Sequence, residues 1–137
     1  MIEKTATITI EDLEGISRTF RLDRITADLG NWVVTQMLAG RARMDGVTQK
    51  LEGILLDSCF FIKNTDAGPV PVKAFEAGRV LIPELTYDLW TRNQLCEEVM
   101  KFNFDPFFER LKKKQKQENE REQALTSGTP LPDSLQT

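Results

Sequence analysis

Apolar and polar side chains alternate over the first 25 residues, as they do in a β-hairpin. The alternation is clear over residues 5–10 and again over residues 18–25, where it places Phe20 and Leu22 on one face. An acidic turn separates the two segments. An isolated hairpin is only marginally stable in water, so we expect its apolar face to pack on helices or its edge to pair with another chain.

After residue 25 the apolar period becomes that of a helix. Residues 27–40 carry an apolar stripe, and Thr26 before them is a suitable N-cap. Residues 47–62 are apolar over a wide arc, which is typical of a central helix. Residues 69–84 include the string Pro-Val-Pro-Val, which favours neither a helix nor a central strand, and are expected to form an ordered loop.

The third apolar stripe begins at Pro83 or Thr86 and is expected to be interrupted at Asp105-Pro106, because proline suits the first residue of a new turn. A short amphipathic helix then follows and ends near Leu111. Residues 112–137 are charged and then polar, so they are expected to be a flexible tail with a disordered end.

These patterns predict a single, mainly helical α+β domain. A β-hairpin over residues 1–25 is expected to precede three to four helices packed as a small bundle over residues 26–111. A charged, then polar flexible tail over residues 112–137 follows, and it is expected to be disordered from about residue 118. The chain has 137 residues, of which 40% are hydrophobic, enough for one modest core.

The residue types that commonly carry catalysis are sparse. The chain has no histidine, and its eight glycines form no phosphate-binding string. Cys59 and Cys96 lack metal-ligand spacing; they could meet in space, but two reduced thiols in apolar segments is the favoured interpretation. The acidic pairs are better interpreted as solvated surface. We therefore expect no catalytic, cofactor or metal site, and a protein that is not an enzyme.

Net charge and hydropathy indicate which classes of partner the chain does not bind. A net charge of −3 argues against nucleic-acid binding, because the basic run Lys112–Lys116 is followed by three glutamates. No apolar run approaches eighteen residues, and the first residues do not form a secretory signal. We expect a cytoplasmic protein that binds neither nucleic acid nor a membrane.

The most informative segment carries four phenylalanines within seven residues, directly before the lysine-rich run. So much aromatic area beside a solvated segment needs cover, either from the protein's own core or from a partner. Core packing is favoured for Trp90, whereas core and interface remain open for the phenylalanines, which we expect to divide between the two. The candidate protein-binding residues are Trp90, Phe102, Phe104, Phe107, Phe108 and Leu111.

Two short motifs resemble those of the tail assembly chaperones of long-tailed bacteriophages. Residues 18–22 (RTFRL) are similar to a TFxL-like second strand, and residues 101–108 (KFNFDPFF) are similar to a closing xxNFxxFF string. The resemblance covers roughly residues 17–111. The Pro-Val-Pro-Val segment and the polar tail match no family pattern.

The resemblance implies a chaperone that coats the tape measure protein, keeps it soluble and helps to recruit subunits of the major tail tube protein. Such a protein would act in the host cytoplasm and be absent from the mature virion. Many families of this kind also make a longer product by ribosomal frameshifting, for which the codons of Lys112–Lys114 could form a slippery string. Assembly along an elongated client favours self-association, and a head-to-tail mode would build an open helical array.

Two other functions remain open. The protein could be a structural virion component, such as a tail tube or connector subunit, although such proteins are usually richer in β-structure than the predicted fold. It could also be a small adaptor or inhibitor that binds a host protein.

Overall fold

The computed structural model describes residues 2–126, and the chain divides into two units between Phe104 and Asp105. The predicted flexible tail over residues 112–137 is wrong for residues 112–126, which are helical, and its remainder, residues 127–137, lies outside the described residues. The elements in chain order are β1 (Thr5–Glu11), β2 (Ser17–Asp23), α1 (Ala27–Leu38), α2 (Val47–Asp57), β3 (Cys59–Thr65), β4 (Gly68–Lys73), β5 (Phe75–Glu76), β6 (Arg79–Val80), a short 3-10 helix η1 (Pro83–Leu85) and α3 (Leu89–Thr126).

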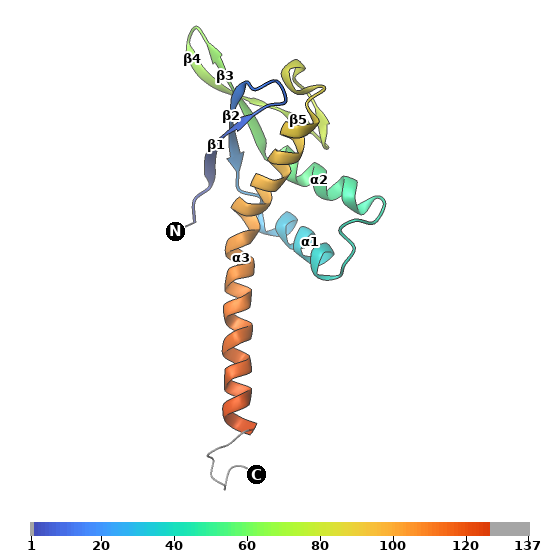
Figure 1. The fold of residues 1–137 in the computed structure, drawn as a ribbon, viewed down its shortest axis with the longest axis vertical. Helices are drawn as coiled ribbons and strands as arrows, with labels where there is room; N and C mark the ends of the chain where they lie inside the picture. The colour runs from blue at the N-terminus through green and yellow to red at the C-terminus, as the bar shows by residue number, and fades with distance from the viewer. Residues whose placement is uncertain (1, 127–137) are drawn as a thin grey trace. The chain divides into compact units, whose positions relative to one another are not determined.

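The predicted helical bundle is wrong. The predicted hairpin is present as β1 and β2, but it is half of a four-stranded antiparallel sheet in the order β1-β2-β3-β4 (Figure 1). The second half comes from residues 59–65, of which 59–62 were expected in a helix, and from residues 68–73, of which 69–73 were expected in a loop. The helix ends early because aromatic and β-branched side chains follow Ser58, and these suit a half-buried pleated strand.

The sheet buries one face and exposes the other. Phe20 and Leu22 of β2 pair with Phe61 and Cys59 of β3, and all four side chains are buried. The rings of Phe20 and Phe61 lie 5.7 Å apart. A single buried face is typical of antiparallel sheets, and it requires the strict alternation that β1 and β2 show in the sequence.

Two short helices follow the hairpin. The side chain of Thr26 accepts a hydrogen bond from the N–H of Leu29, as expected for the N-cap of α1. In α2, Leu55 and Leu56 are buried. Gly53 lies so close to the β5–β6 turn that an added Cβ would come within 3.3 Å of the Ala77 carbonyl carbon.

The last helix begins later than expected and continues through the proline. Residues 83–85 form only η1, and α3 starts after Asp88, whose carboxylate accepts hydrogen bonds from the N–H and the hydroxyl of Thr91. The expected interruption at Asp105-Pro106 is absent, since α3 runs on to Thr126. Pro106 cannot donate to the carbonyl of Phe102, but that carbonyl accepts a hydrogen bond from Arg24 instead. Among residues 2–126, no helix is both long and apolar enough to cross a membrane.

Candidate functional site

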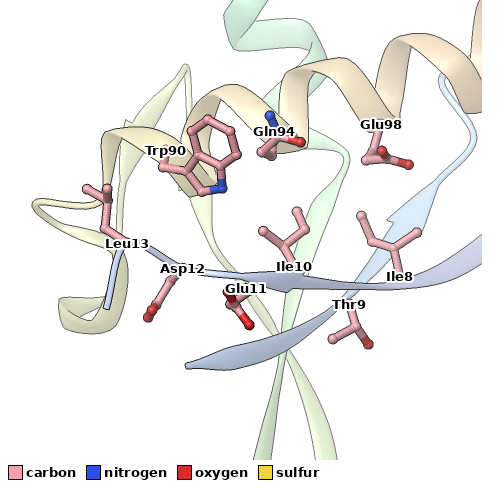
Figure 2. A pocket seen from close by; sticks show the side chains of 9 residues that line it. All are labelled: Ile8, Thr9, Ile10, Glu11, Asp12, Leu13, Trp90, Gln94 and Glu98. Atoms are coloured by element: carbon pink, nitrogen blue, oxygen red, sulfur yellow. The ribbon is translucent and has the colours of Figure 1, made fainter. Parts of the chain in front are cut away.

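An open groove of about 760 Å³ lies between β1 and the first turns of α3 (Figure 2). One wall comes from β1 and the turn after it, from Ile8 to Leu13. The other wall is one face of α3, because Trp90, Gln94 and Glu98 follow one another at intervals of four residues. In Figure 2, Ile8 and Ile10 point toward α3, whereas Thr9 points away from it.

The turn that closes β1 is held by Asp12. One carboxylate oxygen accepts hydrogen bonds from the N–H groups of Glu14 (2.9 Å) and Ile16 (2.8 Å), and the other accepts one from Nε of Arg18 (2.9 Å). The bond from Ile16 is the largest cause that lowers the pKa of Asp12 below its ordinary value of 3.8, although burial opposes it. Asp12 therefore shapes the groove as an ionised group with every partner supplied by the fold.

Exposed apolar side chains gather at the Trp90 end of the groove. Trp90 is 51% exposed, and Leu13, which Figure 2 shows beside it, is 64% exposed. Tyr87 and Leu89, adjacent in sequence, are also exposed. The sequence favoured core packing for Trp90, but the structure leaves half of the side chain in solvent. This arrangement suits the binding of another apolar surface.

Acidic side chains line the same groove. Glu11 lies at the end of β1, with its side chain on the same side of the strand as that of Thr9, and Glu98 lies on the facing side of α3, where its carboxylate is 3.6 Å from Nζ of Lys101. Arg18, a base at the end of the turn after β1, is already paired with Asp12. A ligand of this groove would therefore combine apolar groups with basic or neutral polar ones.

The KFNF part of the closing motif fastens α3 to the segment between β2 and α1. The guanidinium of Arg24 lies 3.8 Å from the centroid of the Phe102 ring. The side-chain oxygen of Asn103 accepts a hydrogen bond from the N–H of Ile25 at 2.9 Å. Phe104 is only 5% exposed, and its ring lies 3.6 Å from the position that a Cβ on Gly30 would take. Phe102 and Phe104 thus lie in the packing of the first unit, and Phe104 has almost no free surface.

The remaining candidates lie in the second unit. The rings of Phe107 and Phe108 meet edge to face, with centroids 5.3 Å apart. Phe107 is 45% exposed, and Leu111, one turn further along α3, is partly exposed. The six sequence candidates therefore lie in three settings: Trp90 in the groove, Phe102 and Phe104 in the first unit's packing, and Phe107, Phe108 and Leu111 on the second unit.

Neither cysteine thiol is in an environment that favours the reactive thiolate. Burial is the main cause that raises the pKa of Cys59 from 9.0 to about 12, and it likewise raises the pKa of Cys96 to about 11. Both thiols are therefore protonated at neutral pH, whereas nucleophilic and metal-binding cysteines are thiolates. Within residues 2–126, no three His, Cys, Asp or Glu side chains converge as a metal site would require.

Sequence reasoning missed the groove itself. Ile8 and Ile10 were visible only as members of an alternating strand, and Gln94 and Glu98 only as polar positions on a helix. The spacing of Trp90, Gln94 and Glu98 shows that they share a face, but nothing local shows that this face lies opposite β1. In comparisons of the chain with protein-family models, curated proteins and solved structures, no match was found.

Proposed function

We propose that this chain is a non-enzymatic assembly chaperone that binds an apolar segment of another protein and keeps it dispersed. The observation that carries the proposal is the half-exposed Trp90 at the end of the groove, with exposed Leu13 beside it. Solvent-exposed tryptophan next to a concave, partly apolar surface is a frequent anchor of protein–protein contacts.

The charges of the chain suit such a role. A holdase needs apolar surface to bind its client and enough charge to remain dispersed, and the chain carries a net charge of −3. Glu98 and Gln94 on the α3 wall of the groove favour an amphipathic client with polar positions beside its apolar ones.

Within this class, a phage tail assembly chaperone is the most specific proposal. Its client would be the long, helical tape measure protein, and it would also recruit subunits of the major tail tube protein. It would act in the host cytoplasm and leave the mature virion. The resemblance of residues 18–22 and 101–108 to the motifs of that family supports this choice.

Contacts next to the first motif segment add support. Residues 18–22 lie in β2, and the two residues that bind the closing motif, Arg24 and Ile25, follow directly after this strand. Residues 18–22 and residues 101–104 therefore belong to one packed unit, whereas residues 105–108 belong to the second unit.

The test measures the concentration of this protein that suppresses aggregation of a tape measure fragment. Light scattering monitors the aggregation. We expect Trp90→Lys to raise that amount about tenfold or more, because a buried tryptophan anchor commonly contributes 2 kcal/mol or more to binding. Leu38→Lys is the matched control, since Leu38 is 64% exposed at the end of α1 and is not among the residues that line the groove.

Circular dichroism establishes that both variants remain folded. Equal suppression by Trp90→Lys and the wild type would contradict the proposed site. Mass spectrometry of purified virions tests the wider assignment, because a structural tail component would be found in the particles and a chaperone would not.

A further inference from the structure

The two edges of the four-stranded sheet differ in their capacity to accept another strand. At the β4 edge, the N–H of Ala74 donates to the carbonyl of Cys59. Bonded and non-bonded pairs alternate in an antiparallel ladder, so the register places Pro69, Pro71 and Lys73 with their amide positions facing outward. Two of these three positions have no N–H, which blocks strand addition at this edge.

The β1 edge carries no such block. Hydrogen bonds from Asp12 N–H to Ile16 (2.9 Å) and from Arg24 N–H to the carbonyl of Lys4 (2.7 Å) fix which residues bond to β2. Every second residue between Lys4 and Asp12 therefore turns its N–H and C=O outward. These residues are Thr5, Thr7, Thr9 and Glu11. Within residues 2–126 their backbone groups have no other hydrogen-bond partner.

We propose that β1 pairs antiparallel with β1 of a second copy of the chain, joining two four-stranded sheets into one. In the register we propose, Ile8 lies opposite Ile8 of the second copy on the two-fold axis, Thr7 pairs with Thr9, and Thr5 pairs with Glu11. This register brings all four outward-facing residues of each strand into the new ladder.

The charges at the two ends of β1 favour this partner. Lys4 precedes the strand, whereas Glu11 ends it and the exposed Glu14 follows in the turn. Antiparallel pairing with an identical strand brings Lys4 of each copy to the acidic end of the other, and no like charges face each other across the ladder. The exposed Thr5, Thr7 and Thr9 side chains are β-branched and neutral, which suits pairing in a sheet.

The difference between the edges also sets the size of the assembly. Pairing through β1 consumes the accessible edge of both copies, and the edges left at the ends are the blocked β4 strands. The product is a closed two-fold dimer, not the open array expected from the sequence. This inference does not depend on the proposed chaperone function, because it concerns only the chain and its copy.

Disulfide trapping tests the register. Residues that face each other directly across a non-bonded antiparallel pair have Cα atoms about 4.5 Å apart, within the range of a disulfide. Ile8→Cys in the full chain should therefore form a covalent dimer on mild oxidation. Thr5→Cys is the control, because in this register the two Thr5 residues lie roughly 20 Å apart along the strands. Cross-linking by Ile8→Cys that does not exceed that of the wild type and of Thr5→Cys would overturn the register.

Removal of one outward N–H tests the pairing itself. We expect sedimentation equilibrium to show a dimer for the wild type, and Thr7→Pro to raise the dimer dissociation constant at least tenfold. Thr7→Val keeps the N–H and should leave the dimer unchanged, as should Lys73→Pro at the opposite edge. A monomeric wild type, or a folded Thr7→Pro that dimerises fully, would overturn the proposal.

If Thr7→Pro does not fold, amide hydrogen exchange on the wild type still tests the pairing of β1 with β1. The N–H groups of Thr7 and Thr9 should exchange quickly in dilute protein and slowly in concentrated protein. Equal exchange at both concentrations would refute β1 pairing, and protection that appears only with a client would assign the edge to the client instead. Client binding by a protein that stays monomeric would leave the chaperone proposal intact while refuting this one.

Discussion

The guanidinium of Arg24 lies 3.8 Å from the centroid of the Phe102 ring, and it also donates a hydrogen bond to the backbone carbonyl of Phe102. That carbonyl would have been the acceptor of residue 106 in an ordinary helix, but residue 106 is a proline. Nε of Arg24 donates to the carbonyl of Glu3 at 2.9 Å. One side chain therefore links the segment before β1, the segment after β2 and the part of α3 that carries Phe102.

Arg24→Lys should lower the free energy of unfolding by about 1–3 kcal/mol, because an ammonium cannot stack on the ring and serve both carbonyls at once. Arg21→Lys is a matched control. Arg21 also stacks on a ring, that of Phe60, but it pairs with Asp23 on the exposed face of the sheet. Arg21→Lys should lower the free energy of unfolding by no more than about 1 kcal/mol. Urea titrations measure both values, and equal losses would contradict the role assigned to Arg24.

Asn103→Ala should destabilise the fold by about 1–2 kcal/mol, because the N–H of Ile25 would lose its acceptor. Asn93→Ala on the same helix controls for the better helix propensity of alanine, since Asn93 is exposed. We expect Asn93→Ala to leave stability unchanged or slightly raised. The urea midpoints of the two variants should therefore move in different directions, and a common shift would show that the contact to Ile25 contributes little.

The part of the fold that sequence predicted well is the part set by local alternation. β1 and β2 followed from a period of two, and α1 followed from a period near 3.6 and a threonine cap. Residues 59–62 are continuously apolar, and periodicity alone does not distinguish a buried strand from the end of a helix. Their aromatic and β-branched side chains were the signal that favoured a strand.

The site was less predictable because its two walls come from distant parts of the chain. Ile10 and Trp90 are both visible as apolar positions, but only the fold brings β1 opposite α3. Pro106 illustrates the same limit. Whether a proline ends a helix depends on what else can bond the carbonyl four residues earlier, and here the donor is Arg24, far away in sequence. Long-range partners of this kind leave no local pattern.

Phe104→Ala and Phe107→Ala should separate core from surface within one motif. Phe104 is 5% exposed, so its truncation should lower the free energy of unfolding by about 3–5 kcal/mol. Phe107 is 45% exposed, and its truncation should change stability by about 1 kcal/mol or less. Thermal unfolding followed by circular dichroism measures both. A strongly destabilised Phe107→Ala would remove that residue from the candidate protein-binding set.

Gly30→Ala and Gly53→Ala should have opposite effects, although both glycines lie inside helices. An added Cβ at Gly30 meets only the Phe104 ring at 3.6 Å, an ordinary contact, so the variant should gain up to about 1 kcal/mol from helix propensity. At Gly53 the Cβ would lie 3.3 Å from the backbone of Ala77, in a turn where Ala77 and Gly78 both have positive φ. Because that turn cannot easily move, we expect Gly53→Ala to lower the free energy of unfolding. Thermal melts of the two variants decide the signs, and a stabilised Gly53→Ala would show that the β5–β6 turn yields.

The buried thiols make stability depend on pH in the alkaline range. Burial raises the pKa of Cys59 from 9.0 to about 12, so between these values the unfolded chain releases a proton that the folded chain retains. The free energy of unfolding should therefore be unaffected by this thiol below pH 9 and fall above it, by up to about 1.4 kcal/mol per pH unit.

The control for this pH dependence is Cys59→Ala, compared with the wild type by urea unfolding between pH 8 and pH 10.5 in the presence of a reductant. The variant should be less stable at pH 8, because it leaves a cavity, but its stability should decline less steeply as the pH rises. All other ionisable groups are common to the two proteins, so their contribution cancels in the difference. Parallel curves would mean that the Cys59 thiol ionises as readily in the folded chain as in the unfolded one, and therefore that it is not sealed beneath the sheet.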